Sequence, residues 1–224
     1  MEGLVRLEAR RIGHKLWILP VSSLLMIVVG SFAAGDLVDY SAVAFELIYP
    51  LFAAVAVGEW CPVRRDEAVD IIFAQTASLR RFVTVRFLVV YSSVILPAIP
   101  AILLVTKIRA GSTYLHSPLM CIAPSFFLSV LALTVNTFRC GNHTSSMIAG
   151  LFWLTLLVTR NFVIEQKLYS IDLFYVFNGG LIREEFLMNR TILILTGIFM
   201  FGWIWLRIRP KSKAGRIRPP LSEE

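Results

Sequence analysis

The sequence has few charged residues and no long polar stretch. Asp, Glu, Lys and Arg make up 17% of its 224 residues, whereas soluble domains carry about a quarter. Hydrophobic residues make up 57% of the chain and mean hydropathy is +0.71. These residues gather in blocks of about 20, the length of helix that crosses a ~30 Å hydrocarbon core. The segments left between the blocks are too short for a soluble domain, which excludes a nucleotide-hydrolysing domain within these residues.

Catalytic and metal-binding patterns are also missing. The chain contains no Walker-type glycine loop, no G-x-S-x-G, no H-E-x-x-H and no Asp-rich metal motif. Its three cysteines show neither metal spacing nor a disulfide framework, and its three histidines fall on separate segments. The sequence therefore predicts no metal site and no catalytic residues. A membrane-embedded lipid-modifying enzyme and a non-transporting membrane anchor or sensor remain as alternatives to the function inferred below.

The apolar blocks predict an all-α polytopic membrane protein with six transmembrane helices. The expected spans are residues 16–34, 41–60, 82–106, 117–138, 146–159 and 191–206. Before them, residues 1–15 place apolar and basic side chains on opposite helical faces, which is typical of a helix lying in the membrane interface. Residues 207–224 form a basic tail. The expected organisation is an interfacial helix, a six-span domain over 16–206 and a cytoplasmic tail.

The basic residues indicate the orientation of the spans. The net charge is +7 and the pI is about 9.7, which in a membrane protein reflects Lys and Arg on cytoplasmic loops rather than a nucleic-acid partner. With both termini inside, sixteen of the 22 basic residues lie on the cytoplasmic side. The other six are Lys107, Arg109, Arg160, Lys167, Arg183 and Arg190. The expected location is a bacterial plasma membrane, crossed several times, with both termini in the cytoplasm.

The loop between the second and third spans has the pattern of a short helix parallel to the membrane. Acidic side chains stand at its start and basic ones at its end, which complements the helix dipole, and an apolar stripe runs between them. Such a surface suits docking into a groove on a partner. The candidate contact residues are Arg64, Arg65, Asp66, Glu67, Asp70, Ile71, Gln75 and Arg80.

The segment between the fifth and sixth spans contains an apolar stretch, Leu173–Ile182, that is too short to cross the membrane. Asn178, Gly179 and Gly180 interrupt it. We expect a re-entrant hairpin that turns at the two glycines, with an ordinary extracytoplasmic loop as the alternative.

Three charged residues fall within the expected spans, where they should face protein or water rather than lipid. Glu59 and Arg86 lie near the cytoplasmic ends of adjacent spans, so we expect an ion pair between them. Glu46 lies nearer the outer half of its span. Lining of a substrate path and packing within the protein are about equally good interpretations of this residue.

This layout resembles the type-2 permeases of ATP-binding-cassette (ABC) transporters. In that family a coupling helix with an acidic start, a Leu-Leu pair and basic residues at its end docks on a separate ATPase subunit. Here Asp66-Glu67, Ile71-Ile72 and Arg80-Arg81 stand in those places, while Ala68 replaces a common glycine and no proline precedes Arg80. A broken apolar segment between the last two spans is also similar to the family.

The resemblance implies a non-enzymatic permease subunit that pairs with a second permease, identical or related. ATP and Mg would be bound by the separate ATPase subunit, and this chain would hold no cofactor. Membrane lipids would surround the spans. The small size of the chain favours export of a peptide or an amphiphilic molecule.

Overall fold

The structure is a computed structural model that describes residues 21, 24–25, 43–61, 79–108, 118–138, 143–166, 172–175 and 183–208. The predicted interfacial helix 1–15, nearly all of the first span and the tail from residue 209 lie outside these residues. So do residues 62–78, which hold most of the predicted coupling helix, and the interruption at 178–180.

Every regular element in the described residues is a helix. A π-helical segment, η1, directly precedes α4, and a short helix, α9, follows α8. The elements are η1 (Val43–Ile48), α4 (Tyr49–Trp60), α6 (Leu79–Ile108), α7 (Leu119–Asn136), α8 (Thr144–Val158), α9 (Arg160–Glu165) and α10 (Arg183–Arg207).

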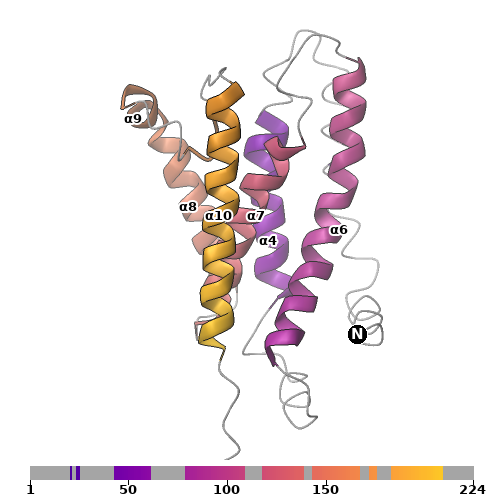
Figure 1. Cartoon of the computed structure of the whole chain (residues 1–224), viewed down its shortest axis with the longest axis vertical. Coiled ribbons are helices and arrows are strands. Elements are labelled where there is room, and N and C mark those ends of the chain that lie inside the picture. Colours follow the sequence, from indigo (N-terminus) through magenta and orange to yellow (C-terminus); the bar gives the residue numbers. More distant parts are fainter. Residues whose placement is uncertain are drawn as a thin grey trace, which may run out of the picture.

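The long helices form a bundle with α7 near its centre, in which α4, α7 and α10 run in one direction and α6 and α8 in the other (Figure 1). Helix α7 packs mainly against α4 and α10, and α4 also contacts α8 and α6. The end of α4 lies beside the end of α7 and the start of α8, because the side chains of Asn136 and Ser145 both bond the carbonyl of Gly58. Arg80, in the first turn of α6, bonds the carbonyl of Ile208 at the end of α10. We call this end of the bundle the basic end.

Small residues allow the central helices to approach closely. In α4, Ala53, Ala54 and Val57 are fully buried, and α7 places Ala123 and Ala132 in the same interior. Interfaces between membrane helices are enriched in small residues for this reason, since van der Waals packing replaces the hydrophobic effect in lipid. The core is therefore built from close backbone packing as well as from large side chains.

Two tyrosine hydroxyls donate hydrogen bonds to backbone carbonyls of neighbouring helices. Tyr49 of α4 donates to the carbonyl of Val94 in α6. Tyr91 of α6 donates to the carbonyl of Ile122 in α7 over 3.0 Å. Because a buried hydroxyl without a partner costs free energy, these bonds fix how α6 lies against the rest of the bundle.

Three helices in the described residues are long and apolar enough to cross a membrane: Leu79–Leu104, Leu119–Asn136 and Glu184–Arg207. Helix α8 is apolar but shorter. Large apolar side chains on the outside of the bundle, such as Val158 and Phe199, are exposed. Such an exterior is compatible with a lipid surrounding and supports membrane association.

The last helix differs from its prediction. The sequence placed the sixth span at 191–206, but α10 begins eight residues earlier, at Arg183. Hydropathy treats Glu184, Asn189 and Arg190 as loop residues because they are polar. The structure places them in the helix, where Asn189 and Arg190 are buried and bonded to residues elsewhere in the protein.

Candidate functional site

Polar side chains gather at two places along the helical segment 43–60. The Glu46 cluster consists of Glu46, Asp172, Asn189 and Arg190, and the Glu59 cluster consists of Gly58, Glu59, Asn136, His143, Ser145 and Ser146. A helix rises about 1.5 Å per residue, so the two glutamates stand about 20 Å apart along it. The Glu59 cluster belongs to the basic end, and the Glu46 cluster lies toward the opposite end.

The Glu46 cluster contains a fully buried ion pair. A terminal nitrogen of Arg190 bonds the carboxylate of Glu46, and the two side chains are 1% and 0% exposed. The other terminal nitrogen of Arg190 donates to the carbonyl of Leu173 over 3.2 Å, and its guanidinium lies 4.9 Å from the ring centre of Phe186. Asn189 donates to the carbonyl of Asp172 over 2.7 Å. One arginine therefore joins η1, the turn at 172–175 and α10.

Glu46 lies in the π-helical segment just before Pro50. In an α-helix the carbonyl of Glu46 would accept the N–H of residue 50, but proline has no N–H. A π-helical turn shifts the register by one residue at this point, and such bulges are frequent at functional sites. The local sequence thus explains why the helix is irregular where its buried charge stands.

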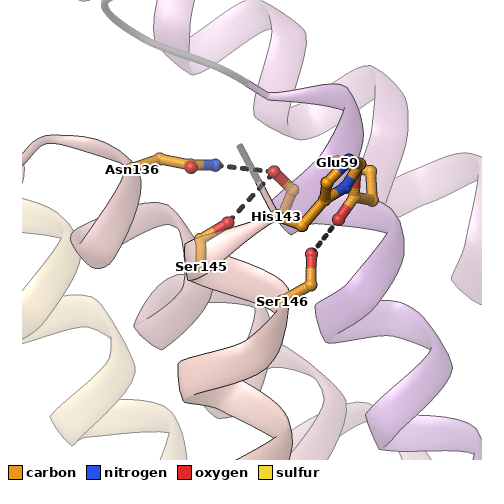
Figure 2. Close-up of polar contacts among 6 residues, drawn as sticks. Glu59, Asn136, His143, Ser145 and Ser146 are labelled. Carbon is orange, nitrogen blue, oxygen red and sulfur yellow. Dashed lines mark hydrogen bonds and ion pairs between the residues drawn. The ribbon is translucent and has the colours of Figure 1, made fainter. Parts of the chain in front are cut away.

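The Glu59 cluster joins the end of α4 to the end of α7 and the start of α8 (Figure 2). The carboxylate of Glu59 contacts Nδ1 of His143 at 2.6 Å through Oε2, and accepts a hydrogen bond from Ser146 through Oε1. The side-chain amide of Asn136 donates to the carbonyls of Gly58 and Cys61 over 3.0 and 3.1 Å. The carbonyls of Gly58 in α4 and of Cys61 directly after it are therefore satisfied by side chains of other helices.

Two backbone features make the Glu59 cluster possible. A Cβ atom at Gly58 would lie 2.7 Å from Oγ of Ser146 and 3.1 Å from its backbone nitrogen, so glycine at this position lets α8 approach closely. His143 adopts a left-handed conformation with φ of 62° directly before α8. That turn directs the start of α8 toward Glu59.

The predicted ion pair between Glu59 and Arg86 is wrong. Glu59 turns toward α8 and bonds His143 and Ser146. Arg86 is buried in α6, where its guanidinium lies 5.6 Å from the ring centre of Phe82. Both residues lie near the same end of adjacent helices, which is why the sequence suggested a pair. The sequence did not indicate that Glu59 lies on the face of α4 that packs against α8.

Of the two interpretations of Glu46, the structure favours packing. Its side chain is completely buried and bonded to Arg190, so it faces protein rather than an open path. Arg190 was counted with the outer loops on sequence alone, and no local pattern signalled the pair, because 144 positions separate the two residues. The polar residues just before the last predicted span were the one feature of the sequence that pointed to a buried polar contact there.

Few of the predicted coupling-helix residues are described. Arg64, Arg65, Asp66, Glu67, Asp70, Ile71 and Gln75 lie outside the described residues, as do Asn178, Gly179 and Gly180. Arg80 is described, and it contacts α10 through the carbonyl of Ile208 and the ring of Trp205. Within the described residues, no group of three His, Cys, Asp or Glu side chains could hold a metal ion.

Known proteins do not identify the chain. No protein-family model, curated protein or solved structure matches it. The candidate function therefore depends on the layout of the sequence and on the contacts between its helices.

Proposed function

We propose that this chain is the membrane-spanning subunit of a bacterial ABC exporter whose substrate is a peptide or an amphiphilic small molecule. It crosses the plasma membrane six times with both termini in the cytoplasm, and pairs with a second permease subunit, identical or related. It is not itself an enzyme. Separate ATPase subunits bind ATP and Mg and act on the helix that residues 64–81 form.

The observation that carries the proposal is that the residues on both sides of the segment 62–78 are bonded at the same end of the bundle. Cys61, directly after α4, accepts a hydrogen bond from Asn136, and Arg80, in the first turn of α6, donates one to Ile208. The helices on both sides of the segment are thus held at the basic end of the bundle. A charged connection with the acid-to-base pattern of a coupling helix would meet an ATPase at that end.

The Glu59 cluster supports the proposal because it offers a mechanical route from this connection into the bundle. Glu59 stands three residues before position 62, where the segment begins. Its carboxylate bonds α8, and Asn136 of α7 bonds the carbonyls on either side of it. A displacement of the segment would therefore move the ends of α4, α7 and α8 together. Switching between inward-facing and outward-facing states would begin from this movement.

Charge reversal of the three acidic residues tests the proposal. We expect the chain, purified in mild detergent from its native membranes, to retain an ATPase subunit. The triple variant Asp66→Lys, Glu67→Lys and Asp70→Lys should lose that subunit while remaining folded in the membrane.

The matched control reverses three acidic charges away from the segment, with Asp36→Lys, Asp39→Lys and Glu184→Lys. This control should retain the ATPase subunit, since its changes lie on the other side of the membrane in the proposed topology. Retention of the subunit by the first variant, or equal loss from both, would show that the docking site is elsewhere.

A further inference from the structure

Arginines and aromatic rings alternate where α6, α7 and α10 meet at the basic end. The guanidinium of Arg80 lies 4.4 Å from the ring centre of Trp205. That of Arg207 lies 4.1 Å from the ring centre of Phe138 and 5.0 Å from that of Trp203. Each arginine is therefore held against an aromatic face by a cation–π contact. We call Arg80, Phe138, Trp203, Trp205 and Arg207 the arginine–aromatic cluster.

The positions of the two guanidinium groups are fixed, yet most of their donors are unused. Nε of Arg80 donates to the carbonyl of Ile208 over 2.7 Å, which caps the end of α10. Among the described residues, the terminal nitrogens of Arg80 and all the nitrogens of Arg207 make no hydrogen bond to the protein. Fixed guanidinium groups with free donors are suited to phosphate, which they bind through two parallel N–H bonds.

Within the part of the chain that the structure describes, the charge around the cluster is positive. Arg81 is an exposed neighbour in α6, and no Asp or Glu occurs between residues 71 and 107 or between residues 191 and 221. The acidic side chain that α4 contributes to this end, Glu59, is engaged with His143 and Ser146. Protein carboxylates therefore do not neutralise Arg80 and Arg207 in the described residues.

The aromatic rings have the exposure of an interface with lipid. Trp203 and Trp205 are 40% and 46% exposed, and Phe138 is 41% exposed. Tryptophan is enriched where the hydrocarbon core meets the headgroups. Leu206, between the last tryptophan and Arg207, is 66% exposed and adds apolar surface for an acyl chain.

From this arrangement we propose that the arginine–aromatic cluster binds the phosphate of an anionic phospholipid. The headgroup accepts hydrogen bonds from Arg80 and Arg207, and the acyl chains lie against Trp203, Trp205 and Leu206. The proposal needs only that α6 and α10 lie in a membrane, so it stands even if the chain serves no ATPase.

Native mass spectrometry of protein released from vesicles of equal phosphatidylglycerol and phosphatidylcholine tests the site. We expect the lipid that remains bound to be enriched in phosphatidylglycerol. A basic residue near the membrane surface favours anionic lipid about fivefold, so the double variant Arg80→Gln and Arg207→Gln should reduce the enrichment about 25-fold. Should the lost cap on α10 unfold that variant, Arg207→Gln alone should reduce it about fivefold.

The matched control, Arg160→Gln with Arg183→Gln, removes the same charge outside the cluster and should reduce the enrichment clearly less than the double variant does. Unchanged enrichment in the folded variants, or an equal loss in the control, would overturn the proposal. Binding of inorganic phosphate at the cluster with no phosphatidylglycerol retained would also overturn it, since the site would then recognise free phosphate rather than a lipid.

Discussion

Removal of one charge from the Glu46–Arg190 ion pair should strongly destabilise the bundle. The side chains are 0% and 1% exposed, so the remaining charge would stay in a medium that solvates it poorly. Breaking a buried pair in this way costs about 3–5 kcal/mol. Glu46→Gln keeps the shape of the side chain and an oxygen acceptor, and removes only the negative charge. We expect it to lower the free energy of unfolding by about 3–5 kcal/mol.

The double variant Glu46→Gln with Arg190→Met separates the ion pair from the other contacts. Arg190→Met alone also loses the bond to Leu173 and the contact with Phe186, so it should be the most destabilised single variant. When both charges are absent, neither is left buried without a partner. The double variant should therefore be more stable than the sum of the single effects predicts, by about 3 kcal/mol.

The assay is unfolding of the detergent-solubilised protein by a denaturing detergent, followed by far-ultraviolet circular dichroism. Glu59→Gln is the matched control, since its carboxylate is 30% exposed and its partner His143 is 70% exposed. An exposed pair of this kind contributes less than about 1 kcal/mol. Additive effects of the Glu46 and Arg190 substitutions, within experimental error, would refute the reasoning.

Three further predictions concern packing, capping and topology. Gly58→Ala should destabilise the protein by about 1–3 kcal/mol because its Cβ would lie 2.7 Å from a serine oxygen of α8; Gly150→Ala, with nothing within 4 Å, should instead stabilise it by up to about 1 kcal/mol. Equal effects in thermal unfolding would contradict the role of glycine. Asn136→Leu should cost about 1–3 kcal/mol in the same assay because the carbonyl of Cys61 loses its side-chain donor and that of Gly58 keeps only Ser145; an unchanged midpoint would show that water replaces the amide. In a cysteine-free background, Asp39→Cys should react with an impermeant maleimide outside the cell and Ser212→Cys only after lysis; the reverse result would invert the topology.

Hydropathy predicted the long apolar helices. The expected span at 82–106 corresponds to α6, Leu79–Ile108, and that at 117–138 to α7, Leu119–Asn136. The start of α10 was not predictable in this way. A polar residue there, Arg190, is stabilised by a partner far along the chain, the carboxylate of Glu46, and a window of sequence does not contain that partner.

The sequence indicated the two glutamates of the candidate site but not their partners, His143 and Arg190. The sequence correctly indicated that Glu46, Glu59 and Arg86 lie within helices of the bundle. The partners of the two glutamates depend on the rotation of α4 and η1 about their axes. Gly58 and the left-handed turn at His143 set that rotation relative to α8, and neither carries a motif that identifies it in advance.

ATP hydrolysis by the purified complex tests the central claim most directly. The proposed function predicts that the chain, tagged and purified from its native membranes, brings with it a subunit that hydrolyses ATP. It also predicts that replacing the Walker A lysine of that subunit abolishes hydrolysis without releasing this chain. A purified protein that contains no ATP-hydrolysing subunit under conditions that preserve its helical bundle would contradict the claim.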